Sequence, residues 1–326
     1  MSASSQTPSV SVTPLEEHGG WSERAVAPPG AGPVTASTRQ RRLDSVPAPL
    51  FCLAAMLTVQ TGIALSTPLF PVLGVAGTTS LRLLVAAGLL LLVNRPRLRG
   101  RSPRALGAAA LLGLASAGMT LMFAAAVDRL PMGTAATIEF LGPLTVALLF
   151  ARRVGHVLWA LLAGVGVVLL TLVGAGAGRG GLDPVGLTCA VGAAVCLGGY
   201  ILLTHTVGSA FTGFEGLALS LTVAALATAP VGLPEAAHAL ARSDRPWLPL
   251  LEVAGVALLF PLLPYMLEMT AVRRLGQRVF SVIASMEPAV SALVGLVVLG
   301  QYLTLVQLSG IACVIAASAG TTLTER

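Results

Sequence analysis

Charged residues are scarce in this sequence, and lysine is absent from it. Only 10% of the 326 residues are charged, against about 25% in a typical soluble domain. Hydrophobic residues make up 55% of the chain, so an ordinary soluble domain is excluded. The apolar residues fall in repeated runs of about 20, the length that an α-helix needs to cross a bilayer. The composition therefore predicts an all-α membrane protein with many spans.

The sequence lacks the residue patterns that several classes of functional site require. The four cysteines, Cys52, Cys189, Cys196 and Cys313, lie inside apolar runs without CxxC spacing, which is typical of packing residues. The four histidines are scattered without metal-ligand spacing, and no nucleophile motif is present. We therefore expect no metal, no cofactor and no enzymatic activity. No basic face is interleaved with aromatic residues, so nucleic-acid binding is not expected either.

The first 46 residues differ in composition from the rest of the chain. They are rich in Ser, Thr, Pro, Ala and Gly and contain no apolar stretch long enough for a signal-peptide core, which predicts a disordered tail over residues 1–46. Ten apolar segments follow, each long enough to cross about 30 Å of hydrocarbon. They cover residues 48–70, 74–93, 105–126, 131–150, 156–174, 184–206, 213–233, 248–271, 277–299 and 303–323.

The arginines orient these spans, because basic residues gather in cytoplasmic loops. If the N-terminus is cytoplasmic, 14 arginines lie in inside segments and 4 in outside segments. The inside set is Arg39, Arg41, Arg42, Arg95, Arg97, Arg99, Arg101, Arg104, Arg152, Arg153, Arg273, Arg274, Arg278 and Arg326, and the outside set is Arg129, Arg179, Arg242 and Arg245. We therefore expect both termini to be cytoplasmic.

The chain also resembles itself at a shift of 145 residues. AVDRL at 126–130 aligns with AVRRL at 271–275, Pro143 aligns with Pro288, and eight of the 25 positions from 126 to 150 match. Five spans separate the copies, and because five is odd, the second copy is inverted in the membrane. The alternative is chance similarity between two Ala/Leu-rich segments. We expect two inverted five-helix repeats, residues 47–175 and 183–324, a common construction of secondary transporters.

The charged residues inside the predicted spans include Arg82, Glu139, Glu268 and Glu287. A charge near the bilayer centre costs about 2.5 to 3.5 kcal/mol even on a lenient scale, so these side chains are expected to face the protein interior. Arg82 and Glu139 each lie about eight residues, or roughly 12 Å, from the outer ends of their helices. They can therefore form a fixed ion pair or face a substrate. Glu287 is expected near the midplane, and Glu268 within one turn of the cytoplasmic end.

Prolines interrupt the two spans that carry Glu139 and Glu287. Pro143 lacks the N–H that would bond the carbonyl of residue 139, and Pro288 has the same effect on the carbonyl of Ala284. In a membrane such free carbonyls are tolerated where they line a cavity, although proline kinks are also common packing devices. We expect Pro143, Pro288 and the neighbouring Gly142 to form pocket or hinge positions.

Further polar side chains lie in other spans. Gln60, in the first span, can hydrogen-bond a polar ligand or another helix. Pro261 and Pro264 predict an irregular helix around Tyr265, which either lines the pocket, packs or anchors the helix at the membrane interface. A buried glutamate such as Glu139 can also carry a proton, because its charged form costs free energy to bury and a conformational change alters its surroundings.

Five strings of the sequence are more particular than general hydropathy. They are GTTSLRLL at 77–84, LPMGTAATIEFLGPLTVAL at 130–148, LPYMLEMTAVRRL at 263–275, SMEPAVSALVGLVVLGQYLT at 285–304 and IAASAGTTLT at 315–324. Through them, residues 48–324 resemble the EamA branch of the drug/metabolite transporter superfamily, and within it the bacterial threonine/homoserine exporter group. In one place the chain departs from the pattern: relatives usually carry an acidic residue where this sequence has Gln301.

The resemblance implies a multi-pass protein of the bacterial inner membrane with ten helices in two inverted halves. It implies export of small amino acids, coupled to protons by alternating access, with Arg82, Glu139, Glu268 and Glu287 lining the pocket. The partners would be the substrate, protons and the lipid bilayer. Three alternatives stay open: another cargo, such as other amino acids, purines or drugs; a membrane enzyme; and a non-transporting scaffold. The oligomeric state is not indicated.

Overall fold

The computed structural model describes residues 47–93, 101–150, 155–174, 183–211, 215–264 and 283–324, with 267, 271 and 274. The expected tail over residues 1–46 lies outside this part of the chain. Where the structure is described, its regular elements are helices and no strand occurs. Every apolar segment predicted from the sequence contains helix, so the all-α fold class is confirmed.

The first half of the described chain contains helices α2 to α8. Helix α2 (Ala48–Ser66) continues through the 3₁₀ turn η1 (Thr67–Leu69) into α3 (Phe70–Leu73). The others are α4 (Val75–Val93), α5 (Pro103–Val127), α6 (Met132–Glu139), α7 (Leu141–Phe150) and α8 (Gly155–Gly174).

The second half is built from helices α9 to α15. They are α9 (Pro184–Ala210), α10 (Glu215–Ala241), α11 (Trp247–Ala257), the π-helical turn η2 (Leu258–Leu262), α14 (Glu287–Leu299) and α15 (Leu305–Thr324). Across both halves, five described helices are long and apolar enough to cross a membrane: Pro49–Leu73, Val75–Val93, Pro103–Val127, Pro184–Gly208 and Glu215–Ala241. Length and apolar composition together support a membrane protein.

Local sequence signals fix several helix ends. Ser102 and Asp183 accept a hydrogen bond from a backbone N–H in the first turn of the helix that follows, and each is followed by a proline. A side-chain acceptor satisfies an otherwise unpaired donor, and proline is preorganised for the first helical position. Gly300 ends α14 in the left-handed conformation, with φ of 64°, which glycine adopts without steric cost.

Two irregular segments lie where prolines predict them. The fourth span is interrupted at Phe140, between α6 and α7, three residues before Pro143. In the eighth span, Phe260 has extended backbone angles, φ of −151° and ψ of 119°, directly before Pro261. A proline disfavours the helical conformation of the residue before it, which accounts for the second interruption. Both breaks therefore follow from the sequence.

One predicted boundary was wrong. The seventh span was expected to end at residue 233, whereas α10 continues to Ala241 and contains Pro230 and Pro234. The extension is rich in alanine, a strong helix former. Its charged residue, Glu235, has a partner in another helix, since its carboxylate accepts the backbone N–H of Gly77 at 2.9 Å. This contact with α4 was not visible from the sequence.

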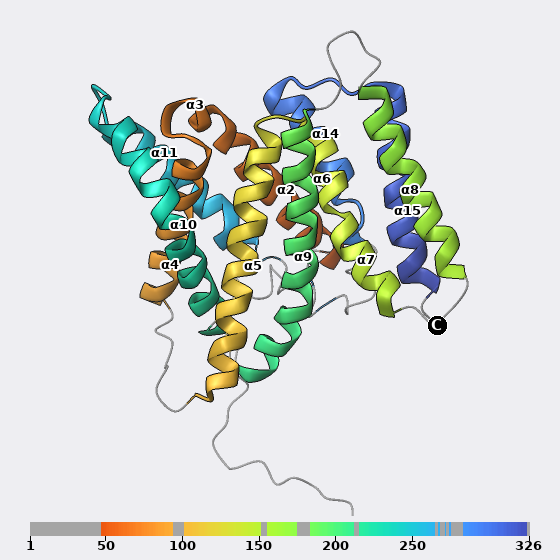
Figure 1. Ribbon diagram of the computed structural model, residues 1–326, viewed down its shortest axis with the longest axis horizontal. Helices are drawn as coiled ribbons and strands as arrows, with labels where there is room; N and C mark the ends of the chain where they lie inside the picture. The colour runs from red at the N-terminus through yellow and green to blue at the C-terminus, as the bar shows by residue number, and fades with distance from the viewer. Residues whose placement is uncertain are drawn as a thin grey trace, which may run out of the picture. The chain divides into compact units, whose positions relative to one another are not determined.

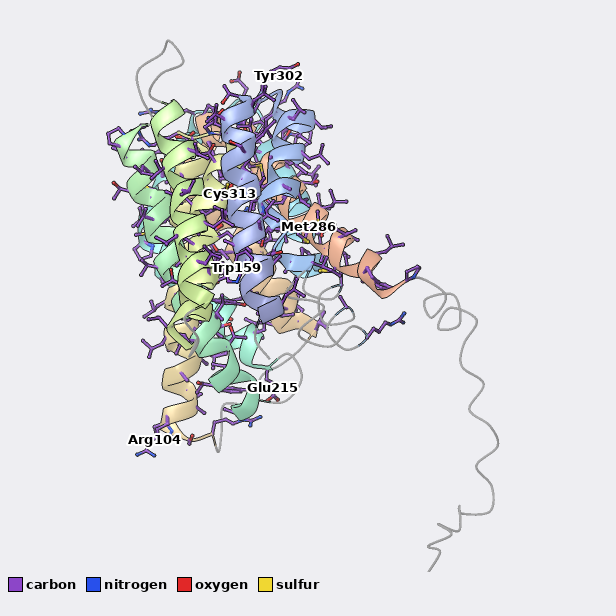
Figure 2. The ribbon with its side chains drawn as sticks, turned by 90° about the vertical axis from the view of Figure 1, so that its right-hand side faces the viewer. Arg104, Trp159, Glu215, Met286, Tyr302 and Cys313 are labelled. Carbon is purple, nitrogen blue, oxygen red and sulfur yellow. The ribbon has the colours of Figure 1, made fainter. Side chains whose placement is uncertain are left out.

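The helices pack as pairs of distant segments. Helix α5 packs against α9 and α10, α4 against α10, and α8 against α15, and the pairs α5 with α9 and α8 with α15 run side by side in Figure 1. Figure 2 shows Arg104 and Glu215 at one end of the bundle and Tyr302 at the other. Segments from both halves of the sequence therefore form one bundle.

Ion pairs join the two halves at opposite ends of the bundle. Arg101 pairs with Glu215 and also donates to the carbonyl of Ala210 at 3.0 Å. Outside the spans at the other end, Arg129 pairs with Asp183 at 2.9 Å. The hydrogen bond from Arg129 lowers the pKa of Asp183 below its usual value, so this carboxylate stays charged over the ordinary pH range.

Gly142 is a close packing position between α7 and α9. A Cβ on Gly142 would lie 2.2 Å from the carbonyl oxygen of Ala194, and backbone cannot easily give way. We predict that Gly142→Ala lowers the free energy of unfolding by about 1 to 3 kcal/mol, the usual cost of overpacking. Gly88→Ala is the matched control, because nothing lies within 4 Å of its added Cβ. Equal melting temperatures of the two purified variants in detergent would contradict this packing.

Candidate functional site

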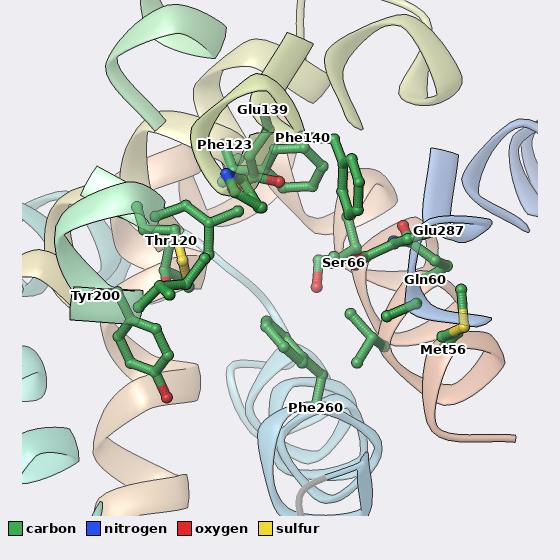
Figure 3. Close-up of a pocket in the computed structure, with 18 of the residues that line it drawn as sticks. Met56, Gln60, Ser66, Thr120, Phe123, Glu139, Phe140, Tyr200, Phe260 and Glu287 are labelled. Atoms are coloured by element: carbon green, nitrogen blue, oxygen red, sulfur yellow. The ribbon is translucent and has the colours of Figure 1, made fainter. Parts of the chain in front are cut away.

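A cavity of about 570 Å³ lies inside the bundle. This volume falls in the range of small-molecule sites, roughly 300 to 1,000 Å³. Figure 3 shows labelled side chains from several helices around this space. The wall is mostly apolar, and its polar members are Gln60, Ser66, Arg82, Thr120, Glu139, Tyr200, Glu287 and Ser318. An apolar wall with few polar groups is typical of a binding site for one small polar molecule.

Arg82 is a buried cation with hydrogen-bonding capacity to spare. Its side chain, on α4, is 3% exposed and donates from Nη1 to Ser66 Oγ at 3.1 Å. The guanidinium carbon lies 4.8 Å from the ring centroid of Phe260. Within the described part of the chain, Nε has no hydrogen-bond partner. A guanidinium held in this way can bind a carboxylate through two parallel hydrogen bonds.

Glu139 lies at the end of α6, beside the interruption at Phe140, and lines the same cavity. The sequence left open whether Arg82 and Glu139 form a fixed ion pair. Among the described residues, the two ion pairs join other side chains, so Arg82 and Glu139 do not form one. Glu287 lines the same cavity as Glu139. Arg82 and Glu139 thus line one cavity without forming an ion pair with each other.

Glu287 and Gln60 connect α14 to α2. Gln60 is 1% exposed, and its Nε2 donates to Oε1 of Glu287 at 3.2 Å. Glu287 begins α14, where a carboxylate is favoured by the partial positive charge of the helix N-terminus. Pro288 follows it within the first turn. Gln60 therefore forms the hydrogen bond to another helix that the sequence allowed, and it also lines the cavity.

Helices α6 and α14 are in close contact at the end of α6 that lies away from Glu139. The backbone N–H of Met132 donates to Oε1 of Gln301 at 2.9 Å, and Ser291 Oγ donates to the Met132 carbonyl at 3.2 Å. A Cβ on Gly133 would lie 2.8 Å from that of Ala292. Gln301 therefore accepts a hydrogen bond from the first backbone N–H of α6.

The remaining predicted site residues are distributed unevenly. Pro143 lines the cavity, and Gly142 packs against α9. Tyr265 and Glu268 lie outside the described residues. Sequence reasoning missed Ser66, because a single serine in an apolar run usually bonds its own helix. Ser66 does so, donating to the carbonyl of Gly62 at 2.8 Å, but it also accepts from Arg82.

Phe260 and Thr120 were also missed. The ring of Phe260 reaches Arg82 because the backbone departs from helical geometry just before Pro261. The prolines in the sequence predict an irregular helix here, but they do not predict which side chain will point into the cavity. Thr120 has no distinguishing neighbour in the sequence, so only the fold brings it to the cavity.

Comparison with known proteins places the chain in a family. The EamA-like transporter family matches residues 184–323. The chain is 37% identical to the threonine/homoserine exporter RhtA of Salmonella typhimurium (strain LT2) over 278 residues, which cover 85% of this chain and 92% of that protein. It is also 37% identical to RhtA of Escherichia coli K12 over 275 residues, 84% of this chain and 90% of the relative.

A solved crystal structure is similar in fold. It covers 85% of this chain and 96% of its own, with 22% sequence identity and a TM-score of 0.50. Identity this low supports the fold alone. The identity of 37% to the two exporters, over most of each chain, carries more weight. On that basis the protein belongs to the EamA-like transporter family.

Proposed function

We propose that this protein is an inner-membrane secondary transporter that exports small amino acids of the threonine and homoserine type. The observation that carries the proposal is a cavity in which the buried Arg82 and the partly buried Glu139, which are oppositely charged, do not pair with each other. Burying unpaired charges costs free energy, so their presence calls for a ligand that uses both. The names of the relatives, threonine/homoserine exporters, support the same cargo.

An amino acid has the charges that such a cavity requires. Its carboxylate would bind the guanidinium of Arg82, whose Nε is available, and its ammonium group would bind the carboxylate of Glu139. The bonds to Arg82 and Glu139 then replace the hydration that each charge of the zwitterion loses on entering the protein. A neutral metabolite would leave both buried charges unpaired, so the site favours zwitterions over purines.

The proposed architecture has ten transmembrane helices in two inverted five-helix repeats, residues 47–175 and 183–324, with both termini cytoplasmic. The helix breaks support the repeat. The fourth span is interrupted at Phe140, and a turn at Ser285 and Met286 precedes α14. Phe140 and Ser285 are 145 residues apart, the offset at which the sequence repeats. Interrupted helices at matching places of two halves are typical of alternating-access transporters.

Proton coupling is the second part of the proposal. Glu139 and Glu287 line the same cavity, and two carboxylates in one mostly apolar enclosure favour holding at least one proton between them. Arrival of an ammonium group at Glu139 would favour release of that proton. Exchange of amino acid against proton then follows from competition for one carboxylate. Glu268 is proposed to contribute near the cytoplasmic end.

Reconstitution tests this proposal directly. Purified protein in lipid vesicles with an imposed pH gradient is expected to move labelled threonine and homoserine faster than empty vesicles, and to stop when the gradient is collapsed by an ionophore. A panel of purines and amines tests other cargoes in parallel. Flux of a purine without any amino acid would identify a transporter of another cargo. Absence of every flux would favour a scaffold, and turnover of a lipid-linked substrate would favour an enzyme.

A further inference from the structure

A smaller cavity of about 130 Å³ lies beside the large one. Both cavities are lined by Arg82, Thr120 and Phe260, so they adjoin at the guanidinium. The smaller one extends toward α5 and α10, away from Gln60 and Glu287, which line only the large cavity. Figure 3 shows Thr120 and Gln60 on opposite sides of Phe260. A molecule bound through Arg82 therefore has this second space next to its bound end.

Hydroxyl groups line the smaller cavity. Ser116 and Thr120 lie one turn apart on α5 and are each 6% exposed. Neither donates a hydrogen bond to a described residue, in contrast to Thr137, which donates to its own helix at 2.6 Å, and Thr222, which does so at 2.7 Å. A buried hydroxyl without a partner costs free energy, so such groups are usually satisfied by water or by a ligand.

A third hydroxyl faces the cavity from α10. Ser220 donates to the carbonyl of Leu217 at 3.0 Å, which fixes its proton and leaves its oxygen free to accept. Apart from Arg82 and Tyr200, the rest of the wall is apolar and includes Leu83, Leu221 and Pro261. Besides Arg82 and Tyr200, the cavity thus offers two hydroxyls that can donate or accept and one oxygen that accepts, in a mostly apolar enclosure.

The volume of the cavity limits what it can hold. A volume of about 130 Å³ accommodates a group of a few non-hydrogen atoms. The side chains of threonine and homoserine each contain three non-hydrogen atoms, one of which is a hydroxyl oxygen. Size and polarity therefore agree on a short, hydroxylated group.

We infer that the cavity lined by Ser116 and Thr120 is the side-chain pocket of the transported amino acid, and that these two hydroxyls select substrates with a side-chain hydroxyl. The inference rests on the proposed function, in which Arg82 holds the carboxylate at the boundary between the two cavities. It adds the basis of selectivity. A site that hydrogen-bonds a substrate hydroxyl discriminates against an isostere without one, because its own polar groups are then left unpaired.

Competition between threonine and valine tests the inference, because the two amino acids have nearly the same shape. Vesicles carrying the full-length protein are loaded with equal amounts of both, differently labelled, and the ratio of initial export rates is measured. Wild type is expected to prefer threonine. Thr120→Val and Ser116→Ala are each expected to reduce that preference by roughly 3- to 10-fold, the effect of one neutral hydrogen bond. Thr120→Ser, which keeps the hydroxyl, is expected to restore it.

Thr222→Val is the matched control, since it makes the same chemical change on α10 outside both cavities. Its threonine-to-valine ratio is expected to equal that of wild type. A wild type that moves both amino acids equally, or Thr120→Val and Ser116→Ala variants with unchanged ratios, would overturn the inference and leave amino-acid export standing. A wild type that moves no amino acid would instead overturn the proposed function.

Discussion

Glu139→Gln is expected to reduce export of threonine by about 100-fold while the protein stays folded. The amide keeps the size of the side chain but removes the charge proposed to bind the ammonium group and the acid proposed to carry the proton. A hydrogen bond to a charged group contributes about 1.5 to 3 kcal/mol, and loss of the coupling proton adds to this loss. The measurement is the initial rate of labelled threonine export under a pH gradient, together with the melting temperature of the purified protein.

Glu252→Gln provides the matched control for Glu139→Gln. Glu252 lies on α11, is exposed and lines neither cavity, so the same chemical change there is expected to leave transport at the wild-type rate. If Glu139→Gln transports normally and melts at a lower temperature, Glu139 has a structural role and the proposed ammonium site is wrong. Loss of flux with an unchanged melting temperature supports the proposal.

The spans of this protein follow from its sequence because the bilayer imposes a simple rule. A helix must offer about 20 apolar residues to cross the hydrocarbon, and helical hydrogen bonds satisfy its backbone without help from distant residues. The interruptions at Phe140 and Phe260 were predictable for a similar reason, since Pro143 and Pro261 act on the residues just before them. Effects carried by neighbours in the chain are visible in the sequence.

The environment of each buried charge was not visible, because it depends on residues far away in the chain. Gln60 meets Glu287 across 227 residues. Ser80 donates to the carbonyl of Thr228 at 2.9 Å across 148 residues. The sequence placed Arg82 and Glu139 at similar depth but left open whether they pair, since depth does not fix the direction of a side chain. That direction decides between a structural and a functional role.

Arg82 gives the sharpest test of whether the charges serve transport or the fold. Arg82→Met is expected to reduce threonine export by about 100-fold, since it removes the proposed carboxylate ligand and its charge-assisted hydrogen bonds. The export rate of Arg82→Lys is expected to lie between those of Arg82→Met and wild type, because an ammonium keeps the charge but not the planar pair of donors. Initial export rates from vesicles measure all three proteins.

In Arg82→Met we expect a large loss of transport but little change in thermal stability. A buried arginine costs about 2.5 to 3.5 kcal/mol, and its charge-assisted hydrogen bond to Ser66 and its contact with the Phe260 ring recover roughly 2 to 4 kcal/mol. Ser66 still donates to Gly62 without Arg82, so no donor is orphaned. The free energy of unfolding is therefore expected to change by no more than about 1.5 kcal/mol in either direction. A large fall in melting temperature would show that Arg82 holds the helices together. A residue that serves only substrate binding is not required for the stability of the fold.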